Sequence, residues 1–312
     1  MTKFDRIEAA INGEEVDRVP FSLWYHFLDI PREQRAGEAL AKAELEFYRT
    51  YDPDIVKVMH DIPYELPNGM AMVATLAQWK DLPVLDPEIG NFGQQLRAIQ
   101  IILEEIGGEA PVIDTVFNPF AYAEKITGDK TLQFLRENPD DFHEGMGQVT
   151  ESLALWTELL VEQGAAGIYL AVQGAVEGVM TEEEYRLNFL PYDLEILERV
   201  EDTAEMNVVH LHGEKLHWSI WEELPFHALS WSSNITPPSI ADARKEFDGC
   251  ILCGVNETTI NSYSPEQVIA EIRAAIAATE GLGYIAAPGC AVPTDCPPAN
   301  LHAFKQAVMM GA

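Results

Sequence analysis

The sequence predicts an α/β protein that folds as a single (β/α)8 TIM barrel. Short apolar runs rich in β-branched residues alternate with longer amphipathic stretches, and the alternation continues through about eight repeats. A sustained βαβ order favours a parallel sheet, and eight repeats are typical of a closed barrel, although a doubly wound sheet has the same local pattern. No low-complexity linker interrupts the chain, so residues 1–312 are expected to form one domain.

The apolar runs predict strands in the following order along the chain: Val19–Leu23, Asp54–Met59, Val112–Phe117, Gly167–Ala171, Asn207–Leu211, Ala228–Trp231, Cys250–Gly254 and Tyr284–Ala287. The stretches between them have helical spacing and predict helices over Gly37–Tyr51, Gly93–Ile106, Asp140–Gln163, Thr181–Thr203 and Pro265–Thr279. Ser264 is the expected N-cap of the last helix, because a proline follows it. Pro63–Pro87 is irregular, and Trp79 within it favours a loop that packs on the fold.

The composition is that of a globular protein with a strongly acidic surface. Hydrophobic residues make up 47% of the chain, and 51 acidic against 20 basic residues give a net charge of −31. No apolar run approaches the roughly 20 residues that cross a bilayer, and the N-terminus is charged where a signal peptide would be apolar. An acidic surface repels phosphate backbones and anionic lipid. We therefore expect a cytoplasmic protein that binds a small molecule and neither nucleic acid nor a membrane.

Polar and aromatic side chains follow almost every expected strand. In a parallel barrel the carboxyl ends of the strands meet at one rim, where active sites form. We expect a group of these residues to contact substrate: Trp24, Tyr25, His26, His60, Asn118, Gln173, Trp231 and Asn256. Asp61 and Glu257 are the expected catalytic residues, because a carboxylate at a strand end can act as a general acid or base. Asp61 could equally be a turn residue or a helix N-cap.

His210 and His212 are the expected ligands of a metal ion, with Cys290. Two residues spaced i, i+2 on a strand point to the same face, so both imidazoles can reach one point. A catalytic zinc ion takes about three nitrogen or sulfur ligands and keeps one open position. Cys290 follows the last expected strand and can supply the third ligand. The residues alone leave a second interpretation open, in which the histidines are hydrogen-bonded barrel residues and Cys290 is a small buried one.

Several segments resemble the uroporphyrinogen decarboxylase superfamily, and together they cover essentially the whole chain. The similar segments are Arg6 to Asn12-Gly13, Asp17-Arg18-Val19-Pro20 with Trp24, His60-Asp61-Ile62, Cys253-Gly254-Val255-Asn256, Gly283 to Cys290, and Pro293 to Leu301. The resemblance implies a (β/α)8 barrel, and it implies that Asp61 occupies the position of the decarboxylase's central acid.

The branches of this superfamily differ in their ligand sets. Decarboxylases have an arginine-rich loop that clamps tetrapyrrole carboxylates, whereas here no arginine follows Trp24 until Arg32, so we expect no activity on uroporphyrinogen. The cobamide-dependent methyltransferases have zinc ligands in a His-x-Cys pattern plus a later Cys, and the positions that resemble them are His210, His212 and Cys290. A histidine in place of one cysteine makes the site less negative and weakens activation of a bound thiol.

The resemblance thus implies a zinc-dependent methyltransferase. It would move a methyl group between a corrinoid, or a methoxylated or methylated small molecule, and a thiol or folate acceptor, with a corrinoid protein as a candidate partner. Two alternatives stay open. One is a decarboxylase or lyase that acts on a small carboxylic acid, with Asp61 stabilising a cationic intermediate. The other is a non-catalytic corrinoid-binding module. The metal content of the purified protein would separate these alternatives.

Overall fold

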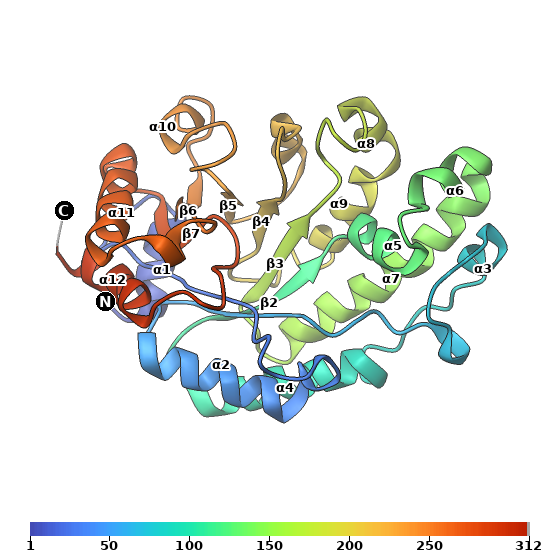
Figure 1. Cartoon of the computed structure of the whole chain (residues 1–312), viewed down its shortest axis with the longest axis horizontal. Coiled ribbons are helices and arrows are strands. Elements are labelled where there is room, and N and C mark those ends of the chain that lie inside the picture. The colour runs from blue at the N-terminus through green and yellow to red at the C-terminus, as the bar shows by residue number, and fades with distance from the viewer. Residues whose placement is uncertain (311–312) are drawn as a thin grey trace.

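The computed structural model describes residues 1–310, and it shows a curled parallel sheet with helices on its outside (Figure 1). Every neighbouring pair of strands is parallel, and the strand order follows the chain. The strands are β1 Val56–Val58, β2 Val112–Phe117, β3 Gly167–Val172, β4 Val208–Leu211, β5 Ala228–Trp231, β6 Cys250–Val255 and β7 Tyr284–Pro288. They are buried almost throughout, which is why their sequences are continuous apolar runs instead of alternating ones.

The helices match the expected amphipathic stretches in most places. They are α1 Lys3–Ile11, α2 Gly37–Tyr51, α3 Leu76–Lys80, α4 Gly90–Ile106, α5 Pro119–Thr127, α6 Thr131–Glu137, α7 Pro139–Glu162, α8 Glu182–Asn188, α9 Leu190–Glu198, α10 Ile240–Ala243, α11 Pro265–Thr279 and α12 Pro298–Met309, with short 3-10 turns η1 Arg32–Gln34, η2 Pro67–Gly69, η3 Trp218–Glu223 and η4 Ile260–Ser262. Ser264 caps α11 as predicted, since its side chain accepts from the backbone of Gln267. In the described part of the chain, no helix has the length and apolar character needed to span a membrane.

The expected first strand, Val19–Leu23, does not form. Phe21 and Ser22 make only isolated parallel bridges, to Ala286 of β7 and to Ile55 beside β1. Pro20 has no N–H to donate to a ladder, although its carbonyl accepts from the Ala286 N–H at 2.8 Å. Residues 1–310 therefore show a seven-stranded, barrel-like sheet whose edge strands are bridged by this segment. A full eight-stranded barrel is not shown.

The single helix expected over Thr181–Thr203 is instead two helices. α8 ends at Asn188, and α9 begins at Leu190 after the non-helical Phe189, whose φ is −131°. Pro191 lies in the first turn of α9 and has no N–H to continue the hydrogen bonding of α8. The break turns the second half of the segment back onto α7.

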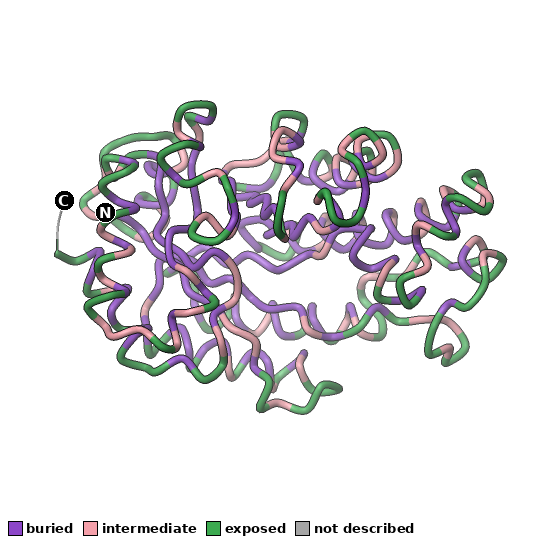
Figure 2. The backbone as a smooth tube through the Cα atoms, turned by 45° about the horizontal axis from the view of Figure 1, so that its top comes forward, coloured by how far each residue is buried: buried purple, intermediate pink, exposed green. Residues whose placement is uncertain are grey.

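Alternate residues of the strands belong to two buried apolar clusters, one on each face of the sheet. In β6, for example, Leu252 belongs to the cluster that contains Trp24 and Tyr169, while Cys253 belongs to the larger cluster shared with the helices. Two α1 residues, Ile7 and Ala10, also pack in the first cluster. The most deeply buried chain lies at the centre of the molecule, and the exposed chain lies at the helices and loops (Figure 2). We call the first cluster the inner core.

A buried ion cluster lies just before β1. The fully buried Asp54 accepts from Arg6 Nη1 at 2.8 Å and from Arg18 Nη1 and Nη2 at 2.6 and 2.8 Å. Its remaining acceptor capacity is used by the backbone N–H of Phe21 at 2.9 Å. This carboxylate thus ties α1 and the bridging segment to the N-terminal end of the sheet.

The irregular segment Pro63–Pro87 packs against α7, as the sequence predicted. Trp79 is fully buried, and its Nε1 donates to the Phe142 carbonyl at 2.8 Å. The two rings stack with centroids 5.8 Å apart. Gly145 of α7 makes this packing possible, because a Cβ there would lie 2.4 Å from Trp79 Nε1. The same segment contributes residues to the cavity described below.

Candidate metal centre and adjoining cavity

The three expected ligands converge at the C-terminal ends of β4 and β7. His210 Nε2 lies 3.4 Å from His212 Nδ1, and Cys290 Sγ lies 4.0 Å from the same nitrogen. One ligand atom from each residue lies within 4.8 Å of the others. His210 is buried, Cys290 is half-buried and His212 is exposed. His210 is therefore held in the sheet, and the cluster is accessible at His212.

The spacing fits a tetrahedral metal ion. With zinc–nitrogen distances of about 2.0–2.1 Å, two ligating nitrogens lie roughly 3.3 Å apart, close to the observed 3.4 Å. The 4.0 Å separation of Cys290 Sγ from His212 is a few tenths longer than the roughly 3.6 Å that zinc would set. Two imidazoles and a thiol are also a donor set that zinc accepts. On this test the residues present fit a zinc ion.

The His210 ring is fixed by its neighbours. Its Nδ1 is 3.1 Å from Ser230 Oγ, and the same hydroxyl is 3.1 Å from Tyr169 OH. Tyr169 also stacks on the imidazole, with ring centroids 5.4 Å apart. With Nδ1 used in this way, Nε2 is the nitrogen left to face His212. Metal-bound histidines are oriented by contacts of this kind through their second nitrogen.

The electrostatics of the cluster favour neutral imidazoles. Burial lowers the pKa of His210 well below its ordinary value, and the charges of His212 and Lys57 lower it further. Burial and the nearby Lys125 ammonium also lower the pKa of His212. Burial raises the pKa of the Cys290 thiol, and Lys57 partly opposes this. A metal binds neutral imidazole and thiolate, so ion binding here would release the cysteine proton.

Glu257 lies beneath the turn that carries Cys290. Its Oε1 accepts from Ser232 Oγ at 2.5 Å, whereas its buried Oε2 has no hydrogen-bond partner among residues 1–310. A Cβ at position 289 would lie 2.6 Å from that oxygen, so Gly289 is required for this close approach. Burial raises the pKa of Glu257. The carboxyl group thus contacts the backbone of the turn and is not part of the ligand cluster.

A cavity of about 750 Å³ lies at the C-terminal ends of β1 and β2. Its walls come from the segment before η1, from the loop after β1 and from α5, and include His26, Arg32, Glu33, His60, Asp61, Tyr64, Met70, Phe117, Tyr122 and Lys125. A volume of this size accommodates a small-molecule ligand or cofactor fragment. The cavity is linked electrostatically to the candidate metal cluster, since the charge of Lys125 acts on His212.

Asp61 faces this cavity in a pair with His26. His26 Nδ1 is 2.8 and 2.9 Å from the two carboxylate oxygens. Burial acts to raise the pKa of Asp61, but the hydrogen bond and charge of His26 outweigh it and lower the pKa. The neighbouring His60 also lines the cavity, and its Nδ1 lies 3.1 Å from the buried Asp114. The two adjacent residues therefore have different polar partners.

The side chain of Asn118, a predicted substrate contact, is occupied in holding the fold, and Gln173, another predicted contact, lies beside it. The Asn118 side chain accepts from the Ala121 N–H and caps α5, and its amide donates to Asp193 and Tyr185, each at 3.1 Å. Gln173 contributes backbone groups to Asn118. An asparagine after a strand is also a common N-cap, which the presence of Pro119 could have indicated.

Three further predicted contacts lie outside the cavity walls. Trp231 is fully buried in the layer between sheet and helices, where its Nε1 donates to the Pro238 carbonyl at 2.8 Å. The Asn256 side chain accepts from the Thr258 backbone at 3.0 Å and closes a local turn. Tyr25 packs on the ring of Phe27. These residues follow strands in the sequence, but their local backbone directs them elsewhere.

Trp24 belongs to the inner core, beside a residue that the sequence prediction missed. Lys57 is buried, donates to Thr115 Oγ1 at 2.8 Å, and places Nζ 4.9 and 4.3 Å from the ring centroids of Trp24 and Tyr169. Burial lowers the pKa of Lys57 to about 8. The available signal was a lysine inside the apolar run of β1. A buried cation below the metal cluster is the largest addition to the predicted site.

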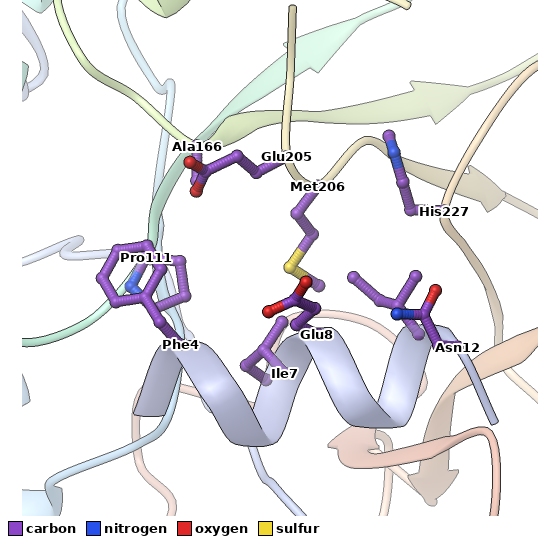
Figure 3. A pocket seen from close by; sticks show the side chains of 10 residues that line it. Phe4, Ile7, Glu8, Asn12, Pro111, Ala166, Glu205, Met206 and His227 are labelled. Atoms are coloured by element: carbon purple, nitrogen blue, oxygen red, sulfur yellow. The ribbon is translucent and has the colours of Figure 1, made fainter. Parts of the chain in front are cut away.

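A second cleft lies at the opposite end of the sheet, against α1 (Figure 3). It has a volume of about 370 Å³ and is lined by Phe4, Ile7, Glu8, Ile11, Asn12, Pro111, Ala166, Glu205, Met206 and His227. Figure 3 shows that the side chains of α1 face the loops that lead into the strands. His227 Nδ1 accepts from the Asn207 N–H at 2.8 Å, so its ring is held in the fold. The N-terminal end of a parallel barrel serves stability more than catalysis.

The comparisons with known proteins agree on one family. The family model described as uroporphyrinogen decarboxylase (URO-D) matches residues 2–310. The methylcobamide:CoM methyltransferase MtbA of Methanosarcina mazei is 25% identical over 218 residues, which are 69% of this chain and 62% of that protein. This match thus spans less than two thirds of the relative's length. The uroporphyrinogen decarboxylase of Serratia proteamaculans is 26% identical over 259 residues, which are 78% of this chain and 71% of that protein.

Solved structures agree on the fold. A methyltransferase from Methanosarcina mazei superposes with a TM-score of 0.81 at 20% identity, over 99% of each chain. A B12-independent methionine synthase from Shewanella sp. W3-18-1 superposes with a TM-score of 0.60 at 12% identity, over 94% of this chain and 93% of that one. At these identities the likeness concerns the arrangement of the strands and helices alone.

Proposed function

We propose that this chain, which belongs to the uroporphyrinogen decarboxylase family, is a zinc-dependent methyltransferase. The methyl group would move between a corrinoid, or a methoxylated or methylated small molecule, and a thiol or folate acceptor. The observation that carries the proposal is the convergence of His210, His212 and Cys290 at one point of the sheet's C-terminal end. The similarity to a methylcobamide:CoM methyltransferase supports a corrinoid as co-substrate and a corrinoid protein as partner.

Zinc held by these three residues would lower the pKa of a nucleophile brought to its open position. The chain's own residues do the rest. Ser230 and Tyr169 keep His210 Nε2 aimed at the cluster. Asp61, supported by His26, faces the cavity and takes up or returns the proton of the reacting group. Glu257 holds the turn of Cys290 and is the second carboxyl group available for proton transfer.

The set of residues that would hold zinc affects which methyl acceptor the site would activate. Two imidazoles and one thiolate leave the zinc site one charge more positive than one imidazole and two thiolates would. A more positive site activates a thiol less strongly, because the bound thiolate keeps less of its electron density. Folates and hydroxyl compounds therefore belong in the assay beside thiols.

A decarboxylase that acts on a small acid is the second candidate. It is favoured by the position of Asp61 in the cavity wall and by the similarity to uroporphyrinogen decarboxylases. Such an enzyme would use Asp61 to stabilise a cationic intermediate and would not need the metal cluster.

The test is zinc content together with methyl transfer from methylcobalamin to thiols and tetrahydrofolate. We expect about one zinc per chain, lost in His210→Ala and Cys290→Ser together with methyl transfer. Cys296→Ser is the matched control, because this cysteine lies outside the cluster. Zinc that survives both ligand substitutions would contradict the metal site. Metal-independent release of CO₂ from a small acid would favour the decarboxylase.

A further inference from the structure

Two cations in the cavity wall have no ionic partner in the described part of the chain. Lys125 and Arg32 line the cavity, and neither the ammonium nor the guanidinium group forms an ion pair or a hydrogen bond with another of residues 1–310. Acidic residues outnumber basic ones by 51 to 20 in this chain, so surface cations easily find a carboxylate. Two unpaired cations in one cavity therefore stand out from the rest of the molecule.

The position of Lys125 is set by aromatic rings. It lies in the last turn of α5, and its Nζ is 3.4 Å from the centroid of Phe117 and 5.5 Å from that of Tyr122. Both rings line the cavity. An ammonium held over ring faces keeps its N–H groups available, because rings attract the charge without accepting strong hydrogen bonds. The cavity wall thus presents a positioned donor.

The acids of the cavity form no ion pair with Lys125, although the charge of Asp61 acts on it. Both oxygens of Asp61 are close to His26 Nδ1, at 2.8 and 2.9 Å. Glu33 lines the outer wall but forms no ion pair with Lys125 or Arg32 among the described residues. An anion that enters the cavity would therefore find an ammonium whose charge is not already paired, and charge-assisted hydrogen bonds of this kind are the strong ones.

We infer that the cavity binds a small substrate through an anionic group, a carboxylate, sulfonate or phosphate, and that Lys125 is the residue that selects for it. The inference rests on the proposed function, which assigns the other end of the substrate to the metal cluster. Lys125 suits this task because it lines the cavity and its charge also acts on His212. Arg32 is exposed at the edge of the same cavity and adds attraction at longer range.

The experiment measures binding by calorimetry to zinc-loaded protein. The probes are 3-mercaptopropionate, its neutral amide 3-mercaptopropionamide, and propionate, which has no thiol. We expect Lys125→Gln to weaken both anionic probes roughly tenfold, as the loss of a charge-assisted hydrogen bond does, and to leave the amide unchanged. Arg32→Gln should have a smaller effect. Lys42→Gln, an exposed residue of α2, is the matched control and should have none.

Lys125→Arg should restore anion binding, because it keeps the charge in a variant with the same helix propensity. Equal weakening of the anionic and neutral probes by Lys125→Gln, or no weakening, would overturn the inference. Sulfonate and phosphonate analogues then rank the anion.

The two proposals fail in different ways. If propionate binds as well as 3-mercaptopropionate and Cys290→Ser changes neither, the anion site stands and the metal-centred function falls. If thiol binding requires Cys290 but ignores the charge of the probe, the function stands and the role of Lys125 falls. Absence of binding by every probe would overturn the anion site.

Discussion

The charged groups at the two ends of the sheet differ in how fully they are paired. At the N-terminal end, Asp54 accepts four hydrogen bonds, and Arg6 and Arg18 surround it. At the C-terminal end, Lys125 has no ionic partner among residues 1–310, and His212 is exposed. At the N-terminal end the charged groups pair with one another and stabilise the fold. At the C-terminal end the Lys125 ammonium is not ion-paired with any described residue. The difference locates function where polar groups are positioned but not satisfied.

The largest effect on this comparison should come from Asp54→Ala. It removes the carboxylate that pairs with Arg18 and leaves Arg6 paired with Asp17 alone. Breaking a buried ion pair costs about 3–5 kcal/mol of unfolding free energy. Urea unfolding measures the loss, while zinc binding per folded molecule should stay unchanged. The control is Glu105→Ala, whose pair with Arg49 is exposed and should contribute less than about 1 kcal/mol. A zinc defect in folded Asp54→Ala protein would break the separation of the two ends.

Glu44→Gln tests a buried carboxyl group near the C-terminal end of β1, where ionisation adds a negative charge. Burial raises the pKa of Glu44 to about 8, while its Oε1 accepts from the Met59 N–H at 2.9 Å. Because the pKa of Glu44 is higher in the folded than in the unfolded protein, its ionisation opposes folding. Its unfavourable effect on the unfolding free energy is absent below about pH 4.5 and grows as the pH rises to about 8. The unfolding free energy of Glu44→Gln, relative to that of the unmodified protein, should therefore increase by roughly 2–4 kcal/mol between pH 5 and pH 9. An identical pH dependence of unfolding in both proteins would refute this assignment.

Asp61→Asn should impair the reaction and spare the fold. Removal of a general acid or base costs about 100-fold or more in rate, and Asp61 faces the cavity, where a neutral amide can be solvated. Steady-state kinetics measures the effect, with zinc content and melting temperature as controls. His26→Gln should produce a smaller loss in the same direction. Full activity in Asp61→Asn would remove this carboxylate from the mechanism.

Gly145→Ala should have the smallest effect and perturb the cavity only through packing. The new methyl would lie 2.4–2.5 Å from Trp79, and overpacking of this kind costs about 1–3 kcal/mol. The matched control is Gly147→Ala in the same helix, where nothing lies within 4 Å of the added carbon. Thermal unfolding of the pair should show a lower midpoint for the first variant alone. Equal midpoints would mean that the segment carrying Trp79 adjusts freely.

Local pattern predicted much of this molecule, and it failed where tertiary context decides. Seven of the eight expected strands appear, since fully buried parallel strands are short apolar runs. Val19–Leu23 has the same composition, but Pro20 limits its hydrogen bonding and only isolated bridges form. The helix over Thr181–Thr203 was expected to be continuous, and Pro191 breaks it.

The convergence of His210, His212 and Cys290 was predictable because its signal is largely local. His210 and His212 share a strand face whatever the rest of the fold does, and the resemblance indicated Cys290. Lys125 carried no comparable signal, since a lysine late in a helix is ordinarily a solvated residue that favours the helix C-terminus. Only the tertiary packing of α5, which contacts α6 and α7, places it in the cavity wall. Trp231 shows the reverse, because it follows a strand and yet lies outside the barrel interior.

Helix α1 affects the route by which small molecules can reach the candidate site. Ile7 and Ala10 complete the inner core from the N-terminal side, so the sheet has a packed floor beneath the metal cluster. In the proposed methyl transfer, reactants would therefore enter and leave at the end of the sheet where Lys125 and Asp61 line the cavity. If both substrates shared this opening, the small molecule would bind before a bulkier donor covers it. Product release would then follow release of the donor, which would make it a rate-limiting step.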